Sequence, residues 1–289
     1  MLFLIGSIVL TSYLTLSFKV TQRLRINTFQ AIVFNYLFCV ITGSLFNGYF
    51  PVTDAALQQP WFPWAVAMGI IFICTFNVIA FTTQQLGVSV ASVANKLSLA
   101  IPFIFSVFLY NEPIGAVKLL GIVLALLAVY LTVKPGIASS RKRNSWLLLL
   151  PPLLFAASGL LDTLIKYTEQ RFLDGTNNND FLITAFASAA GLGLLALGIL
   201  VLTGRQQLEY KAVLAGAAIG IPNYFSIWFL VAVLRQYAGN SSAIIPVNNM
   251  SIVLFSALAA WLLFKERLSL TNWLGILLSV CAIALLAFG

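Results

Sequence analysis

The chain alternates between long apolar runs and short stretches that hold most of its polar residues. Charged residues and clusters of Pro, Gly and Asn interrupt the apolar sequence repeatedly. A helix needs about 20 residues to cross the ~30 Å hydrocarbon core of a bilayer. Division of the chain at these interruptions predicts ten spans of that kind, at roughly 2–18, 28–49, 62–83, 88–109, 114–133, 146–167, 180–203, 211–234, 241–264 and 270–288.

The apolar runs predict helices and not strands. An open strand would leave backbone groups without hydrogen bonds in lipid, and the runs lack the alternation of a transmembrane barrel. The fold class predicted is therefore an all-α polytopic membrane protein. Composition supports it, because 61% of the residues are hydrophobic and only 8% are charged, whereas soluble domains carry about 25% charged residues.

Two segments of the chain repeat one another at a constant offset of 154 residues. Within 109–129 and 263–283, seven of 21 positions are identical without a gap. The identical pairs are Leu109/Leu263, Glu112/Glu266, Leu120/Leu274, Gly121/Gly275, Ile122/Ile276, Leu124/Leu278 and Ala128/Ala282. The same register continues upstream, where Asn95 matches Asn249. The repeat predicts an internal duplication.

Ten spans divide into two halves of five. The predicted first repeat covers residues 1–137, a basic linker covers 138–145, and the second repeat covers 146–289. Because each half has an odd number of spans, the second copy enters the membrane in the opposite sense. The prediction is thus two inverted five-helix repeats, a recurring construction of secondary transporters that bind substrate near the midplane.

Loop charge predicts the orientation of the termini. Connectors after odd-numbered spans hold eleven Lys and Arg residues, and those after even-numbered spans hold four. The positive-inside rule then places both termini outside the cytoplasm. The net charge of +8 is interpreted as basic loops beside lipid headgroups, with no nucleic-acid partner.

The chain lacks several residue types and motifs on which metal, cofactor and nucleotide sites depend. The chain has no His, and its three Cys residues lack a paired spacing, so we expect no zinc, haem or iron–sulfur site. No Gly-rich phosphate loop with Lys and Ser or Thr occurs, so we expect no ATP hydrolysis. We expect no cofactor and no enzymatic activity. The first span lacks a basic n-region and a cleavage site, and is interpreted as a retained helix.

Lys96 and Asp162 are the ionisable residues buried deepest in the predicted spans. Lys96 lies about 12 Å from one end of its span at 1.5 Å per residue, and a cation there is expected to face a cavity, a carboxylate or backbone carbonyls. An alternative is a structural lysine in an ion pair or snorkelling to one interface. Asp162 is a candidate proton or cation site, a partner of Lys96, or half of a local pair with Lys166 four residues later.

Amides and one aromatic residue complete the candidate site. Pro246 is expected to disturb its helix and free carbonyls near the amides that follow it. Asn residues also join transmembrane helices, for about 1 kcal/mol each. The candidate substrate-binding residues are Lys96, Asn95, Asn77, Asn223, Asn248, Asn249 and Tyr224.

Lys19, Lys166 and the two glutamates of the repeat favour structural roles. Lys19 and Lys166 end the first and sixth spans, where snorkelling explains both. Glu112 and Glu266 precede the fifth and tenth spans and are interpreted as caps and turn anchors, since acidic side chains favour helix N-termini.

The ten spans, the two halves and the paired Glu112…Gly121 and Glu266…Gly275 blocks resemble EamA-type members of the drug/metabolite transporter superfamily. The resemblance implies that spans three, four, eight and nine line a central cavity, with contributions from one and six. It also implies cytoplasmic termini, opposite to the loop charges. The first span lacks the acidic residue with which four-helix multidrug relatives exchange protons.

The function expected is a secondary transporter in the inner (plasma) membrane that exports small organic metabolites by alternating access. The cation at Lys96 favours amino-acid-like or carboxylate-bearing solutes, and Asp162 is the candidate for coupling to a proton or ion. One alternative is a cationic multidrug exporter that uses Asp162. Another is an intramembrane lipid-handling protein, and the oligomeric state stays open.

Overall fold

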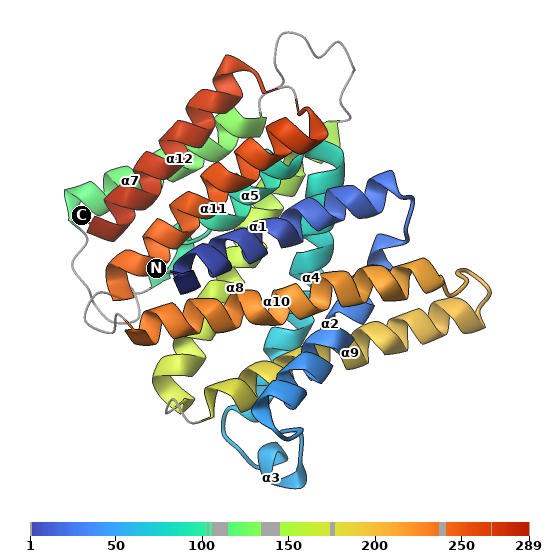
Figure 1. The fold of residues 1–289 in the computed structure, drawn as a ribbon. Helices are drawn as coiled ribbons and strands as arrows, with labels where there is room; N and C mark the ends of the chain where they lie inside the picture. The colour runs from blue at the N-terminus through green and yellow to red at the C-terminus, as the bar shows by residue number, and fades with distance from the viewer. Residues whose placement is uncertain are drawn as a thin grey trace. The chain divides into compact units, whose positions relative to one another are not determined.

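Helices make up the structure, and their apolar sequences explain why. The computed structural model describes residues 2–102, 104–105, 115–133, 145–173, 177–236, 241–266 and 268–288, and no strand occurs in these ranges. The helices are α1 (Leu2–Arg23), α2 (Thr28–Asn47), α3 (Asp54–Leu57), α4 (Phe62–Leu86), α5 (Val88–Leu97), α7 (Ala116–Val133), α8 (Leu150–Phe172), α9 (Asn178–Leu202), α10 (Tyr210–Gln236), α11 (Ser241–Phe264) and α12 (Leu270–Phe288), with a 3₁₀ turn at Ser145–Leu149 (Figure 1).

Seven of the described helices are long and apolar enough to cross a membrane. Three shorter apolar stretches, Val88–Pro102, Ala116–Thr132 and Leu270–Leu286, fall on the remaining predicted spans. The all-helical membrane class is confirmed, while the count of ten spans stays a prediction. Helices α11 and α12 have the predicted bounds, whereas α1 and α8 run five residues further than predicted.

The predicted fourth span is interrupted. Helix α5 ends at Leu97, Ser98 and Leu99 form a turn, and helical backbone resumes at Ala100. Pro102 explains the interruption, because a proline has no N–H for the carbonyl four residues earlier and its ring clashes with that carbonyl. Here that carbonyl belongs to Ser98, which instead accepts from the Ile101 N–H at 2.8 Å. The predicted span 88–109 is therefore not one continuous helix.

Contacts divide the chain into two compact units. The first comprises residues 1–19, 78–162 and 226–289, and the second comprises residues 20–77 and 163–225. Helices α1, α4, α8 and α10 each have residues in both units. Each unit also draws on both halves of the sequence, so compactness does not follow the predicted repeat boundaries.

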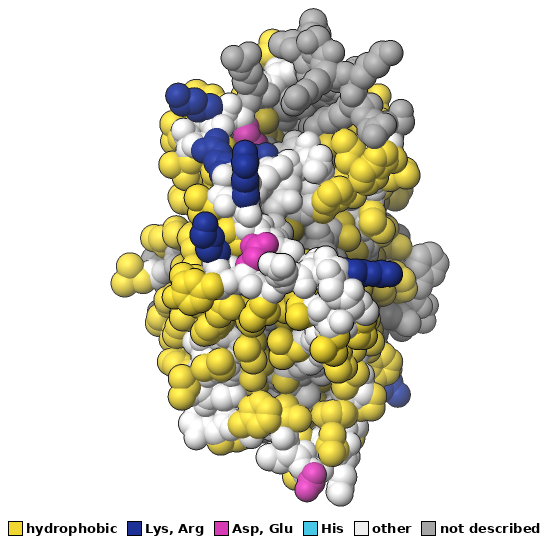
Figure 2. Space-filling model, turned by 90° about the vertical axis from the view of Figure 1, so that its right-hand side faces the viewer, with side chains coloured by type: hydrophobic (Ala, Val, Ile, Leu, Met, Phe, Trp, Pro, Cys, Tyr) yellow, Lys and Arg dark blue, Asp and Glu magenta, His cyan; other side chains and the backbone are white. Residues whose placement is uncertain are grey.

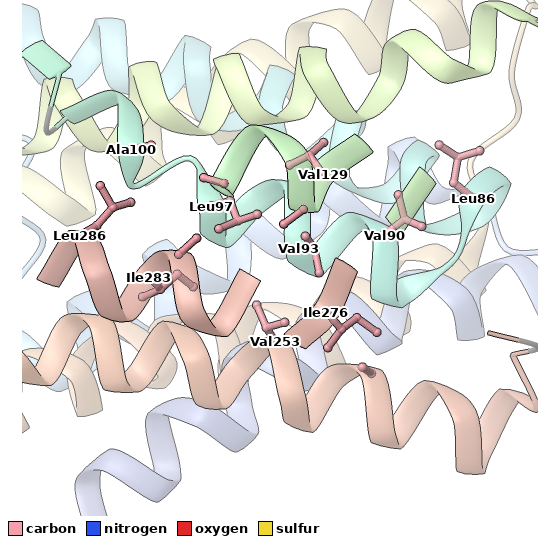
Figure 3. Close-up of a cluster of buried hydrophobic side chains, with 14 of the residues drawn as sticks. Leu86, Val90, Val93, Leu97, Ala100, Val129, Val253, Ile276, Ile283 and Leu286 are labelled. Atoms are coloured by element: carbon pink, nitrogen blue, oxygen red, sulfur yellow. The ribbon is translucent and has the colours of Figure 1, made fainter. Parts of the chain in front are cut away.

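The first unit has an apolar core formed by α5, α7, α11 and α12. Leu86, Val90, Val93, Leu97 and Ala100 recur at intervals of three or four residues and are buried against α7 and α12 (Figure 3). This spacing puts them on one face of the helix. Helix α5 therefore turns its other faces, with Asn95 and Lys96, away from this core.

Helices α7 and α12 pack along their length through equivalent contacts (Figure 1). A Cβ on Gly121 would lie 3.0 Å from Cγ of Leu286, and a Cβ on Gly275 would lie 2.7 Å from Cγ2 of Thr132. The 154-residue offset converts Gly121 into Gly275 and Thr132 into Leu286. The start of each helix thus packs against the end of the other, as across a two-fold axis. This antiparallel pairing of equivalent segments agrees with the predicted inverted repeat.

The second unit is organised by α2 and α9, which pack against each other. The Asn27 side chain caps α2 by accepting from the Gln30 N–H at 3.2 Å, which satisfies one of the free donors at a helix start. Gln30 donates to the Gln207 carbonyl at 2.8 Å and accepts from the Glu209 N–H at 2.9 Å. These contacts hold the loop before α10 against the start of α2.

The exposed surface is rich in apolar side chains. Figure 2 shows one face on which hydrophobic residues are widespread and Lys and Arg are few. Exposed large side chains include Leu195, Ile199 and Leu202 on α9, and Trp261, Leu262 and Leu263 on α11. Such a surface is unfavourable in water and suits contact with lipid chains. The protein is therefore a multi-pass membrane protein.

Candidate functional site

Lys96 lies in the last turn of α5, beside the interruption at Ser98. Lys96 and Asn95 are both half-buried, while Leu97 between Lys96 and Ser98 is completely buried. No described residue accepts a hydrogen bond from the Lys96 ammonium within 3.5 Å. A cation is favourable at a helix C-terminus, where unpaired carbonyls carry partial negative charge. The structure thus places a half-buried cation at the end of an interrupted apolar helix.

The start of α5 is held by a residue from the other half of the chain. Glu266 accepts from the Val88 N–H at 2.8 Å and from the Ser89 hydroxyl at 3.3 Å. Gly87 precedes them with φ of +109°, and a Cβ there would lie 3.0 Å from both Glu266 carboxylate oxygens. Positive φ and a close approach both favour glycine. Glu266 is therefore a helix cap.

Glu266 caps α5 and not the helix that follows it. Helix α12 has its own cap: Ser269 Oγ accepts from the Asn272 N–H at 3.2 Å, and Asn272 Oδ1 accepts from the Ser269 N–H at 3.0 Å. This reciprocal pair is a capping box. Sequence proximity alone suggests the wrong helix for Glu266, because its partner lies 178 residues away. Glu112 lies outside the described residues.

Asp162 lies on α8, where this helix approaches the turn after α5. A Cβ on Gly159 would overlap the Ile101 side chain, so the absence of a side chain lets α8 come close. Three residues after Gly159 and three residues before Ile101, Asp162 Oδ2 lies 3.1 Å from Ser98 Oγ. Gly159 and Pro102 were not among the predicted site residues. The sequence signal for this close approach was Gly159, a small residue one helical turn before Asp162.

Lys96 and Asp162 lie on neighbouring segments, because Ser98, two residues after Lys96, contacts Asp162. Both are half-buried, and no ion pair within 4.0 Å joins these two described residues. The predicted alternative of a local pair between Asp162 and Lys166 concerns a side chain outside the described part of the structure. An unlike charge stabilises each ionised group in surroundings of low dielectric constant.

Helix α11 packs against α5 and brings two of the predicted amides into the same unit. Asn248 is buried, and its Oδ1 has no hydrogen-bond partner among the described residues. Asn249 is half-buried. A buried acceptor without a donor is costly in an apolar interior. Helical backbone continues through Pro246, from Ser241 to Phe264, so the disturbance predicted at Pro246 does not interrupt α11.

The other three predicted residues belong to the second unit. Asn77 Nδ2 donates to the Ile73 carbonyl of its own helix at 2.7 Å. Asn223 Nδ2 donates to Asn35 Oδ1 at 3.1 Å, and the Cys39 thiol donates to the Gly220 carbonyl at 3.3 Å. Asn223 and Asn35 thus join α10 to α2.

Tyr224 is buried beside this amide pair. It packs against the rings of Phe46 and Phe225, and its hydroxyl has no hydrogen-bond partner among the described residues. A Cβ on Gly43 would lie 2.8 Å from the Tyr224 ring, so this ring fills the space that the glycine leaves. Lys96, Asn95, Asp162, Asn248 and Asn249 therefore share the first unit, while Asn77, Asn223 and Tyr224 share the second.

Comparison with known proteins places these features in a family. The chain is 28% identical over 287 residues to an uncharacterized protein of Haemophilus influenzae, with 97% of this chain and 95% of that protein covered. A solved crystal structure with 16% identity matches 99% of this chain and 96% of its own, with a TM-score of 0.63, and so has the same fold. The model of the EamA-like transporter family matches residues 1–134 and again residues 145–288. With both halves matched, the chain belongs to the EamA-like transporter family.

Proposed function

We propose that the protein is a secondary transporter that exports small carboxylate-bearing solutes, including amino-acid-like metabolites, across the inner (plasma) membrane by alternating access. The observation that carries the proposal is Lys96, a half-buried cation at the end of an interrupted apolar helix. A charge within a membrane span is expensive and marks a functional site unless it is neutralised locally. Asn95 and Asn248 supply polar groups on α5 and on the adjacent α11.

Broken helices support the same proposal. In secondary transporters, discontinuous helices near the midplane present unpaired backbone groups to substrate and coupling ions. Helix α5 stops at Leu97 because Pro102 interferes at Ser98, and Lys96 immediately precedes this stop. Because Lys96 lies beside this break, the broken helix and the cation together support binding of an anionic ligand at this place.

A thermal-stability screen of the purified protein tests the proposal. Amino acids, organic acids, nucleosides, sugars and cationic drugs are compared for wild type and Lys96→Met. A ligand that binds the folded state at 100 times its Kd stabilises it by about 2.7 kcal/mol. We expect stabilisation by carboxylates in wild type and none in Lys96→Met. Lys211→Met is the matched control, since Lys211 is exposed at the start of α10.

A second function is favoured by Asp162. Its half-buried carboxylate on α8 is the group that a cationic drug would need in a multidrug exporter. Stabilisation by cationic drugs that survives in Lys96→Met and disappears in Asp162→Asn would support this alternative. Stabilisation by carboxylates that is unchanged in Lys96→Met would contradict the assignment of the anion site.

A further inference from the structure

The Ser98 hydroxyl faces two acceptors but has one proton. Ser98 is completely buried. Its Oγ lies 2.5 Å from the Asn95 carbonyl oxygen and 3.1 Å from Asp162 Oδ2. A carbonyl oxygen only accepts, and so does an ionised carboxylate. With Asp162 ionised, the two contacts therefore have to share a single proton.

Protonation of Asp162 satisfies both contacts at once. A neutral carboxyl group carries an O–H, which can donate to Ser98 Oγ while Ser98 donates to the Asn95 carbonyl. The shorter distance to Asn95 agrees with this direction of donation. Hydrogen bonding to the neutral form favours protonation of a carboxyl group, and a nearby cation favours its ionisation. Donation from a neutral Asp162 to Ser98 and attraction by the Lys96 cation therefore favour opposite protonation states of Asp162.

We infer that Asp162 takes up one proton when a carboxylate binds at Lys96, so that solute and proton move together through the cycle. The inference rests on the proposed function and extends it to the coupling ion. In the empty site the Lys96 cation stabilises ionised Asp162. A bound carboxylate neutralises that cation and adds a negative charge of its own, and Asp162 then binds a proton and donates it to Ser98.

The charge balance of the site is conserved by this exchange. Before binding, Lys96 is +1 and Asp162 is −1. After binding, Lys96 is +1, the solute carboxylate is −1 and Asp162 is neutral. Lys96 is the described cation on the segment that contacts Asp162, two residues before Ser98. The step is electroneutral for a monocarboxylate, so the solute gradient and the pH gradient set its direction, and the membrane potential does not.

Calorimetric titration with lactate, L-glutamate and succinate tests the coupling. The titrations are repeated in buffers of different ionisation enthalpy, which reports the protons taken up per ligand bound. We expect one proton for wild type with lactate, and a Kd that rises tenfold per pH unit while Asp162 is ionised in the free protein and protonated in the complex. We expect Asp162→Asn to bind with no proton uptake and no pH dependence, because its amide can donate to Ser98.

Ser98→Ala tests whether the Ser98 hydroxyl, and not the charges alone, favours protonation of Asp162. Without Ser98 the protonated carboxyl group loses its acceptor, so the rise in Kd should begin at lower pH than in wild type. Ser92→Ala is the matched control, since Ser92 is also buried on α5 and its hydroxyl has no described partner.

The outcomes distinguish the two proposals. Proton uptake that persists in Asp162→Asn overturns the coupling inference and leaves the anion site standing. Carboxylate binding that is unchanged in Lys96→Met, or no carboxylate binding to wild type, overturns the proposed function and the coupling with it. A pH profile unchanged in Ser98→Ala overturns the role of the hydroxyl.

Discussion

Gly275 packs against Thr132 where the start of α12 meets the end of α7. A Cβ on Gly275 would lie 2.7 Å from Thr132 Cγ2 and 2.8 Å from the Thr132 backbone nitrogen. The equivalent contact from the other repeat is Gly121 with Leu286, at 3.0 Å to the side chain and 3.2 Å to the backbone nitrogen. The repeated glycines thus let two equivalent antiparallel helices pack closely, as small residues do between membrane helices.

The two glycines of this pair are predicted to differ in tolerance. Gly275→Ala is expected to lower the free energy of unfolding by about 1–3 kcal/mol, because the backbone of Thr132 cannot move without shifting α7. Gly121→Ala is expected to cost less, since the Leu286 side chain can rotate. Thermal unfolding in detergent measures both, with Gly198→Ala as control because nothing lies within 4 Å of its added Cβ. Equal destabilisation of the two variants would contradict the difference between a backbone contact at Thr132 and a side-chain contact at Leu286.

The Glu266 cap is predicted to stabilise α5. Glu266→Ala leaves the Val88 N–H and the Ser89 hydroxyl without their acceptor, and loss of a helix cap costs about 0.5–2 kcal/mol. Chemical denaturation in mixed micelles provides the measurement. Asp54→Ala is the control, since Asp54 is an exposed acid in the short helix α3. Equal stability of Glu266→Ala and wild type would show that the cap contributes nothing.

The amide pair between α2 and α10 is predicted to be energetically coupled. Asn35 accepts from Asn223 at 3.1 Å, and hydrogen bonds between membrane helices contribute about 0.6 kcal/mol on average, with about 1.7 kcal/mol as an upper value. A double-mutant cycle with Asn35→Ala and Asn223→Ala should give a coupling in this range. Asn77→Ala paired with Asn35→Ala is the control cycle, because the Asn77 amide binds its own helix. Additive losses for the first pair would exclude a direct interaction.

Tyr49 follows the end of α2 at Asn47 and provides a pH-dependent prediction. Its hydroxyl lies 2.8 and 2.9 Å from the two Asp180 carboxylate oxygens, and this hydrogen bond is the main cause that raises the pKa of Tyr49 above the ordinary 10.0. Because the pKa of Tyr49 is raised on folding, the hydrogen bond to Asp180 contributes to stability below about pH 10, where Tyr49 is protonated. It is lost as the pH rises through the folded-state value.

Phenolate absorbance measures this titration as the difference between wild type and Tyr49→Phe. We expect the Tyr49 component to titrate above its ordinary range in wild type. It should return toward that range in Asp180→Asn, which removes the negative charge opposite the phenolate. A midpoint that does not change in Asp180→Asn would contradict the assigned cause.

The apolar runs by themselves determined the helical membrane class and most helix bounds, because exclusion of water forces backbone groups to pair within each segment. The 154-residue repeat determined that Gly121 and Gly275 are equivalent, and Lys96 and Asp162 were identifiable as costly charges. Pro102, the cause of the break after Leu97, is also present in the sequence, but the apolar pattern alone predicts a continuous span there.

Only the tertiary structure decided which distant residues meet. Glu266 caps α5, Asn35 binds Asn223, and Ser98 reaches Asp162 because Gly159 lets α8 approach Ile101. None of these pairs is close in sequence, and each depends on how helix faces pack. Periodicity identifies the buried face of a helix, but the partner of each polar group follows from packing that no single segment encodes.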